Sequence, residues 1–589
     1  MKIKMTSITG MARSILISFT AIVFICLISC RQNDNVRSDT YQPAPFDPLD
    51  LTAYGTAKPI EPKGYFAIAI RYVHPPRVEW MENEGVANYR LLLLQDGKVL
   101  GATEAKASPA VAVEGWDKTR PGKASVAIEG YDTEGKRVAL SRIFPFYIVP
   151  DFSEEASSTE VRTPAEAAWL VFDALSLFQP ASKTKLPQDT LARLIPPLVY
   201  SATLGPDGRQ HKASFPVLHD WLYVDMCEAL LRLPAEESSY QRVREFARGV
   251  GEHILRGRLS DDYIYGGMIL GCTDWYGNPM LNIGGLDEKT QEKTKRLVEP
   301  AKCAYAAEAL LKLYEMLGET RFLEAAVKMA EVLVKTQAGN GSWPTRVDGM
   351  TGEVLGTYGT SVAAVISFLA RLETHKSDQR WSECSSKAMN WMIEHPLRTF
   401  GWVVNYEDNL AHASEFNPYA GLSNWDLFHF VRHVAKHPSS LEGAAGRMYE
   451  QMEWNDNHFV FYGPDPLLPF DPWVPSCAEQ GNPSSFISPG GCWLPMDFHT
   501  ANWGRALLAM YRLTGEKSWM EKARAASATL TQYQLPDGRT LTWMPDRSLG
   551  LSAHVFGNAT GNFWPSGWAA AASFWAELAE EETTKTKKN

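Results

Sequence analysis

The chain has 589 residues, with 58 Lys and Arg against 68 Asp and Glu and a formal net charge of −10. This length allows more than one domain. The charges are spread without long blocks, which argues against a basic surface for nucleic acid, so no nucleic-acid partner is expected.

The N-terminal segment has the pattern of a targeting sequence. Basic residues precede an apolar run, residues 15–28, that ends in Ser29-Cys30. The alternative is an ordinary transmembrane anchor, but the run is short for a span, which takes ~20 residues. The pattern resembles a bacterial lipoprotein signal, in which residues 1–29 are removed and Cys30 is acylated. The resemblance implies attachment to a membrane through lipid alone, at the bacterial outer membrane, the cell surface or the periplasm. Residues 30–62 are expected to form a polar tether.

Residues 63–150 alternate apolar and polar side chains in several short runs, such as Tyr89, Leu91 and Leu93. Short strands separated by Asp/Glu-Gly turns predict an antiparallel β-sandwich. The segment resembles a fibronectin type III or immunoglobulin-like module. Residues 151–163, rich in Ser, Thr and Glu, are expected to be a linker.

Residues 164–582 alternate two kinds of helix. One kind is amphipathic, and the other is apolar on nearly all sides and must be buried. The predicted amphipathic helices are 164–178, 240–257, 320–337, 380–395, 441–453 and 516–533. The predicted apolar helices are 216–233, 301–317, 359–373, 423–437, 498–514 and 565–580. Residues 583–589 are a polar tail.

Six such pairs predict a double ring, the (α/α)6 toroid. An open helical solenoid is the alternative, but its last helix should be polar, and the helix at 565–580 is apolar. A turn of the form Gln-x-x-x-Gly-x-Trp runs from Gln337 to Trp343, and related turns recur at Gly401-Trp402 and from Pro536 to Trp543. With the lipoprotein signal and the β-sandwich, they resemble the six-hairpin carbohydrate-active enzymes, which include glycoside hydrolases, polysaccharide lyases and epimerases. The turn motif is general to this architecture and does not select one family.

The resemblance places the cleft at the end of the ring where the apolar helices begin. We therefore look for catalytic groups in the segments that enter these helices. Hydrolysis of a glycosidic bond needs two carboxyl groups, one as proton donor and one to activate water or attack the sugar. The candidates for these roles are Asp220, Asp274, Asp426 and Asp497, with His219 and His499 for proton transfer or hydroxyl binding. Two of the aspartates, Asp426 and Asp497, could instead be helix N-caps, and His219 could be a core residue.

Aromatic and amide side chains accompany these groups. The rings expected to stack on sugars are Trp275, Tyr276, Trp425 and Trp503. A lyase would need other groups, namely an amide to neutralise a uronate carboxylate and a Tyr or His as base. Asn424 and Asn502 are candidates for the first role, and His219, His499, Tyr358 and Tyr263 for the second. Arg432 and His433 are expected to lie too deep.

No metal-binding pattern is present. The sequence has no CxxC pair, no His/Cys cluster and no EF-hand spacing, so neither a metal nor another cofactor is expected. The sequence is compatible both with a disulfide between Cys477 and Cys492 and with two free thiols. The sequence therefore predicts a glycan-degrading surface lipoprotein, a glycoside hydrolase ahead of a polysaccharide lyase. A non-catalytic glycan-binding protein is the alternative from another class, and an oligo- or polysaccharide is the expected partner in each case.

Overall fold

The computed structural model divides the chain into two compact units at Val149. It describes residues 58–62, 71–148, 161–176, 201–204, 210–214, 219–271, 296–356, 362–399, 423–437, 444–461, 476–480, 493–495, 497–540, 562–563 and 565–586. None of the helices in these ranges is both long and apolar enough to cross a bilayer. The signal segment and Cys30 lie outside the described residues, as does Cys492.

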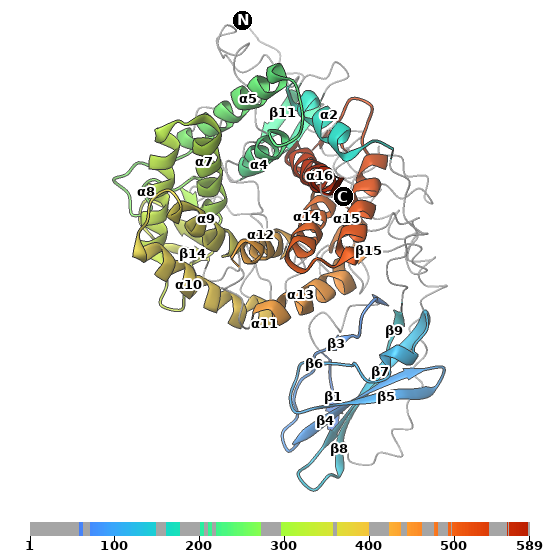
Figure 1. The fold of residues 1–589 in the computed structure, drawn as a ribbon. Helices are drawn as coiled ribbons and strands as arrows, with labels where there is room; N and C mark the ends of the chain where they lie inside the picture. The colour runs from blue at the N-terminus through green and yellow to red at the C-terminus, as the bar shows by residue number, and fades with distance from the viewer. Residues whose placement is uncertain are drawn as a thin grey trace, which may run out of the picture. The chain divides into compact units, whose positions relative to one another are not determined.

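The first unit is a mostly antiparallel β-domain (Figure 1). Its larger sheet has the path β1-β8-β7-β4-β5, with β9 paired to β7 and β2 paired to β9. The strands of this sheet are β1 (Lys58–Ile60), β2 (Arg71–Tyr72), β4 (Asn88–Gln95), β5 (Lys98–Ala105), β7 (Gly122–Tyr131), β8 (Arg137–Ser141) and β9 (Phe144–Ile148). A second pair joins β3 (Arg77–Val78) to β6 (Ala110–Val111).

The core of the β-domain follows the predicted alternation. Tyr89, Leu91 and Leu93 on β4 are buried, and their neighbours along the strand are less so. They pack in one cluster with Trp80, whose ring lies 5.0 Å from that of Tyr89. Burial of every second side chain is what a sheet with one face on a core requires. The fibronectin or immunoglobulin type of this domain stays a prediction.

The second unit contains the predicted double ring of helices. The inner helices are α4 (Trp221–Leu230), α7 (Cys303–Leu317), α9 (Ala363–Glu373), α12 (Ser423–Lys436), α14 (Asp497–Thr514) and α16 (Pro565–Thr586). Each contacts the next in this order, and α16 contacts α4 (Figure 1). This last contact closes the ring and excludes the open solenoid.

The outer helices lie around the inner ring (Figure 1). They are α2 (Pro164–Ser176), α5 (Glu237–Arg256), α8 (Thr320–Thr336), α10 (Gln379–Glu394), α13 (Ala444–Phe459) and α15 (Lys517–Gln532), with the short α11 (Pro396–Thr399) between α10 and α13. The predicted helices match these bounds to within a few residues, except at three ends: the first inner helix begins five residues late, and α13 and α16 each run six residues further. The alternation of amphipathic and fully apolar helices therefore predicted the ring architecture correctly.

The recurring Gln-x-x-x-Gly turn joins neighbouring outer helices. Gln337 donates through Nε2 to the carbonyl of Gly341 in its own turn, at 3.0 Å, and to that of Cys384 on α10, at 2.9 Å. Gln534 does the same to Gly538, at 3.2 Å, and to Ala167 on α2, at 2.8 Å. The second copy links α15 to α2 and so closes the outer ring.

Glycine is required in both copies of this turn. Gly341 and Gly538 have φ values of 97° and 93°, which side chains rarely adopt. A Cβ atom would also lie 2.3 Å from the Lys387 carbonyl in the first copy and 2.1 Å from the Leu170 carbonyl in the second. The turns are therefore structural, as is Trp343, whose indole donates to the Leu333 carbonyl at 3.0 Å.

A buried network of charges fills the middle of the inner ring. Arg505 on α14 donates to Asp225 on α4, at 2.7 Å, and to Glu577 on α16, at 2.8 Å. Lys312 on α7 donates to Asp225, at 2.5 Å, and Arg432 on α12 donates to Glu308 on α7, at 2.6 Å. Arg371 of α9 lies 3.7 Å from Glu308, so all six inner helices take part.

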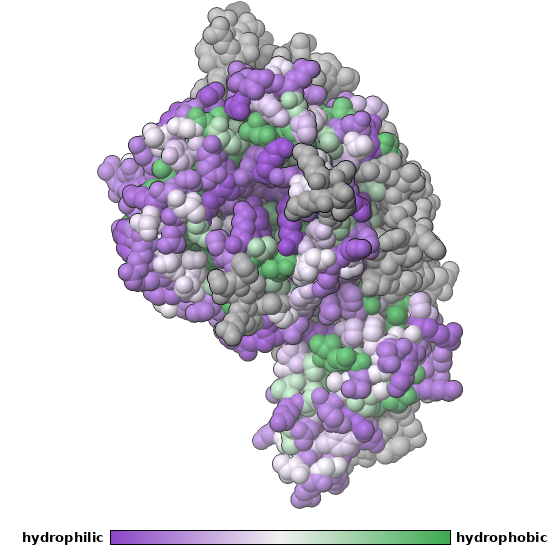
Figure 2. Space-filling model, viewed as in Figure 1, coloured by the Kyte–Doolittle hydropathy of each residue, from purple (hydrophilic) through white to green (hydrophobic). Residues whose placement is uncertain are grey.

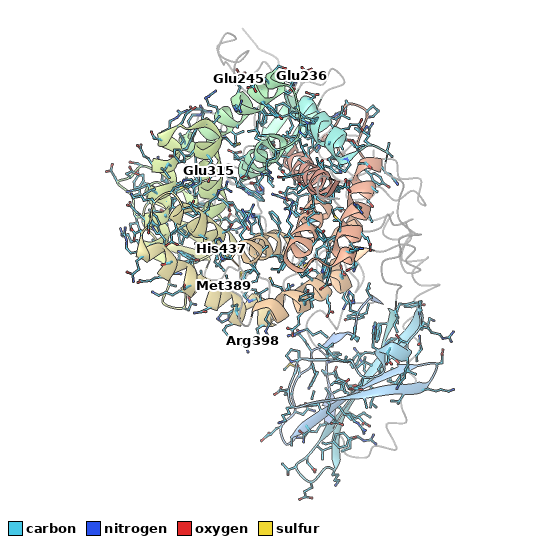
Figure 3. The ribbon with its side chains drawn as sticks, in the orientation of Figure 1. Glu236, Glu245, Glu315, Met389, Arg398 and His437 are labelled. Atoms are coloured by element: carbon cyan, nitrogen blue, oxygen red, sulfur yellow. The ribbon has the colours of Figure 1, made fainter. Side chains whose placement is uncertain are left out.

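The network continues towards the C-terminal ends of α7 and α9, where Arg371 donates to Glu315 and the ring of His375 lies 2.7 Å from the same carboxylate. Glu315 on α7 and His437 beyond α12 lie beside the central opening, while Glu245, Met389 and Arg398 lie in the outer ring (Figure 3). The surface around the hollow in the middle of the ring is mainly hydrophilic (Figure 2). Polar groups thus occupy the ring interior up to this end.

Candidate functional site

The inner helices all begin at one end of the ring. Small antiparallel sheets lie in the segments that lead into them: β10-β11-β18 (Ser201–Leu204, Gln210–Ser214 and Asn562–Phe563), β12-β13-β14 (Leu297–Val298, Arg346–Asp348 and Val354–Gly356) and β15-β16-β17 (Val460–Phe461, Ser476–Gln480 and Trp493–Pro495). We call this end the mouth of the ring. Of the predicted catalytic residues, Asp220 directly precedes α4 and Asp497 begins α14.

Several predicted residues fall outside the described part of the chain. Asp274, Trp275, Tyr276 and Tyr358 belong to segments that are not described. Asn424, Trp425 and Asp426 lie in the first turn of α12, as predicted, but only their backbone is described. The same holds for Cys477 in β16. The roles predicted for these residues stay predictions.

Asp497, the first residue of α14, is a buried carboxyl group with an unusual proton affinity. Its side chain is 1% exposed. Oδ1 accepts a hydrogen bond from the backbone N–H of Phe498 at 2.6 Å, and Oδ2 accepts one from the hydroxyl of Thr540 at 2.6 Å. Burial raises the pKa of Asp497 to about 7, and these two bonds offset only part of the effect. The group is therefore partly protonated at neutral pH.

Two chain segments shape the surroundings of Asp497. A Cβ atom on Gly567, in the first turn of α16, would lie 2.7 Å from Oδ1. Thr540 is the last described residue before a segment that leads to α16. The glycine at position 567 therefore leaves room for the carboxyl group of Asp497. Among the described residues, no cation contributes to the pKa of this group.

Asp220, directly before α4, is a second buried carboxyl group at the mouth. It is the N-cap residue of α4, but its side chain makes no capping bond. Instead Oδ2 lies 2.7 Å from Nδ1 of His253, which is in the last turn of the outer helix α5. Burial raises the pKa of Asp220, and His253, His219 and Arg256 oppose this rise. The two aspartates thus differ, because only Asp220 has an imidazole partner.

The remaining predicted residues with described side chains are buried, except for Tyr263. His219 lies next to Asp220, and burial lowers the pKa of His499 to about 3, which keeps that ring neutral. Asn502 donates through Nδ2 to the Phe498 carbonyl, at 2.9 Å, one turn back along α14. Trp503 is 0% exposed, so the structure does not support its predicted stacking on a sugar. Tyr263 is half-buried in the segment after α5.

The sequence analysis missed a third buried carboxyl group near the mouth. Glu299 lies four residues before α7, and its Oε1 accepts from Nε of Arg346 on β13 at 3.0 Å. Lys302 lies 3.3 Å from the other oxygen. Two cations share one carboxylate here, which makes this cluster a charged support for the sheet. The signal in the sequence was Glu299-Pro300, directly before an apolar helix.

Aromatic rings from three inner helices meet just inside the mouth. Trp221, the first residue of α4, stacks on Tyr305 of α7 with 4.9 Å between ring centroids and 19° between planes. The imidazole of His429 on α12 meets both rings edge-on, at 5.4 Å and 4.7 Å. The charge network lies one turn deeper, since Asp225 is four residues beyond Trp221, ~6 Å along the helix. From the mouth inward, the site therefore consists of carboxyl groups, then the aromatic layer of Trp221, Tyr305 and His429, and then the charge network.

The comparisons with known proteins are distant. No family model and no curated protein matches the sequence, and no group of three or more metal-binding side chains occurs within the described residues. A family 76 glycoside hydrolase from a bovine Bacteroides thetaiotaomicron strain is similar in structure, with 13% identity, a TM-score of 0.45 and coverage of 87% of this chain and 98% of that one.

Two further solved structures are also similar. A cellobiose 2-epimerase from Spirochaeta thermophila has 12% identity and a TM-score of 0.47, covering 72% of this chain and 97% of that one. An unsaturated glucuronyl hydrolase specific for heparin has 10% identity and a TM-score of 0.41, with 72% and 97% covered. Similarities at this level do not establish a shared activity.

Proposed function

We propose that the protein is a glycan-processing enzyme that acts at the mouth of the ring, with hydrolysis of a glycosidic bond as its reaction. The observation that carries this proposal is the buried carboxyl group of Asp497, which holds a proton near neutral pH at the start of an inner helix. A carboxylic acid that keeps part of its proton occupancy at neutral pH can protonate the oxygen of a leaving sugar.

Asp220 has the complementary properties. Its hydrogen bond with His253 favours the ionised carboxylate, whereas Asp497 has only neutral donors. Burial raises the pKa of both groups, but only at Asp220 does a hydrogen-bonded imidazole oppose the rise, and this difference in partners is the basis for assigning the acid and base roles. In this proposal Asp497 donates a proton to the departing oxygen, and Asp220 activates water or attacks the anomeric carbon.

The proposed substrate class rests on the aromatic layer. Trp221 directly follows Asp220 on α4 and stacks on Tyr305, which lies in the first turn of α7. Both rings are almost fully buried, so they support the wall of a sugar-binding site from within rather than stack on a sugar face. The charges of the ring interior pair with one another, so they favour neither a neutral nor an acidic sugar.

The test is incubation of the full chain with a panel of neutral polysaccharides (mannan, xylan, cellulose oligosaccharides) and uronate-containing ones (pectin, alginate, heparin). New reducing ends without ultraviolet absorbance support hydrolysis. Absorbance of a conjugated double bond means elimination, which would replace hydrolysis by lyase chemistry. Binding without any product would favour a glycan-binding protein.

Variants connect the product to the two carboxyl groups. Asp497→Asn and Asp220→Asn should each lower kcat by about 100- to 10,000-fold, the usual contribution of an acid or base. Glu245→Gln, at an exposed position on α5, is the control and should leave kcat unchanged. Full activity in Asp497→Asn would remove this residue from the reaction.

We also propose that Cys30 carries lipid and anchors the protein at the bacterial surface or in the periplasm. The sequence Leu27-Ile28-Ser29-Cys30 supports this. Metabolic labelling with palmitate should mark the wild type and not Cys30→Ala. Equal labelling of both would contradict the proposal.

A further inference from the structure

His429 on α12 is a buried imidazole that the sequence analysis did not single out. It is 1% exposed and lies in the second turn of its helix, level with the first turns of α4 and α7. Its ring meets those of Trp221, Tyr305 and Phe428 at centroid distances of 5.4, 4.7 and 4.9 Å. It therefore belongs to the aromatic layer next to Asp220.

The neighbours of His429 determine which ring nitrogen carries the proton. Nη2 of Arg432 lies 3.1 Å from Nδ1, and a guanidinium can only donate. Nδ1 must therefore accept, so the proton of the neutral ring is on Nε2. Arg432 is itself held by Glu308, whose other oxygen lies 3.8 Å from Nδ1, too far for a hydrogen bond.

The imidazole stays neutral for two reasons. Burial lowers the pKa of His429 well below its usual value, and the charge of Arg432 lowers it further. Glu308 and Asp225 oppose this, while Lys312 adds to it, and the net shift is downward. His429 is thus a fixed donor through Nε2 rather than a group that titrates in the physiological range.

The Nε2–H group has no hydrogen-bond partner within the described residues. Leaving such a buried donor unpaired costs about 1–3 kcal/mol, and native structures rarely retain it without a reason. The surrounding rings offer at most a weak N–H···π contact. A donor held by Arg432 and Glu308 and left unpaired beside aromatic rings is suited to an oxygen atom of a ligand.

We propose that His429 is a substrate-binding residue whose Nε2–H donates to an oxygen of a pyranose, either a hydroxyl group or the ring oxygen. This inference rests on the proposed function, since it assumes that a glycan enters the mouth. In it, the buried rings of Trp221 and Tyr305 hold the imidazole in place, and His429 orients the sugar relative to Asp220.

Two reciprocal variants separate this role from a structural one. His429→Gln keeps a donor near the position of Nε2 but loses the acceptor for Arg432. His429→Asn keeps an acceptor near the position of Nδ1 but loses the donor. His433→Asn, one turn further along α12 and also buried, is the control.

The readouts are kcat/KM on the polysaccharide that yields product in the panel, and the urea midpoint of each full-length variant. We expect His429→Asn to lower kcat/KM about 10- to 100-fold, and His429→Gln to retain most of it. The urea midpoint should follow the opposite order, because His429→Gln breaks the bond to Arg432. His433→Asn should keep the kcat/KM of the wild type.

The proposal is overturned if activity follows stability, with His429→Gln inactive and His429→Asn active, since His429 would then act only through Arg432. Unchanged kcat/KM in both variants, or equal losses in both, would also overturn it. These outcomes are distinct from failure of the proposed acid, which is judged from Asp497→Asn on the same polysaccharide.

Discussion

Replacing Arg505 by methionine tests whether the charge network holds the inner ring together. Arg505 is 1% exposed and bridges Asp225 on α4 and Glu577 on α16. Methionine fills similar space but leaves both buried carboxylates short of one positive charge. Removing one partner of a buried ion pair costs about 3–5 kcal/mol. We expect Arg505→Met to lower the free energy of unfolding by this amount, a large share of the ~5–15 kcal/mol of a typical domain.

The loss should depend on pH with a defined sign. Burial alone would raise the pKa of Asp225, but Lys312 and Arg505 outweigh it and the net pKa is below the usual range. A carboxylate with a lowered pKa stabilises the fold above its unfolded pKa of ~4, and this contribution is lost as pH falls through the folded value. Without Arg505 the folded pKa values rise. The deficit of Arg505→Met should therefore be larger at pH ~7 than at pH ~5.

The assay is urea unfolding of the full chain, followed by far-ultraviolet circular dichroism at both pH values. Arg524→Met is the matched control, because Arg524 on α15 makes a single pair with Glu582, at 2.8 Å, at a partly exposed position. Such a pair contributes ~0–1 kcal/mol. A loss in Arg505→Met no larger than that of the control, or one independent of pH, would refute the role assigned to the network.

Two further predictions concern Asp497 and the packing beside it. A carboxyl group with a raised folded pKa binds its proton more tightly in the folded state, so stability is lost as pH rises from ~4 through about 7. Asp497→Asn should therefore have a higher free energy of unfolding than the wild type at pH ~8, by up to about 4 kcal/mol, and the gain should be smaller at pH ~5. An equal gain in the free energy of unfolding at both pH values, measured by urea unfolding, would contradict the raised pKa. Gly504→Ala should cost about 1–3 kcal/mol by overpacking, because its Cβ would lie 2.3 Å from the ring of Phe574. Gly446→Ala, with open space around the position, is its control, and a similar midpoint in both would refute the close packing of α14 on α16.

Much of the fold could be predicted because it depends on local periodicity. Whether a helix is apolar on one side or all round is encoded in its own residues, and this was enough to separate the inner helices from the outer ones. Asp220 and Asp497 were found in the same way, as polar residues at the start of apolar helices. Their position along the helix required no knowledge of distant neighbours.

The contacts that give these residues their properties are distant in sequence. His253 lies 33 positions from Asp220, and Thr540 lies 43 positions from Asp497. No local pattern marks such partners. His429 was missed for the same reason, because its tautomer depends on Arg432 and its surroundings come from α4 and α7.

The pH dependence of kcat/KM tests most directly whether Asp497 is the acid. The account predicts that activity falls as pH rises past about 7, where Asp497 loses its proton. Thr540 donates to the carboxylate and so lowers this pKa, and Thr540→Val should move the alkaline limb to higher pH. Reducing ends released from the active polysaccharide give the rate at each pH. An alkaline limb at the same pH in the wild type and Thr540→Val would show that another group carries the proton.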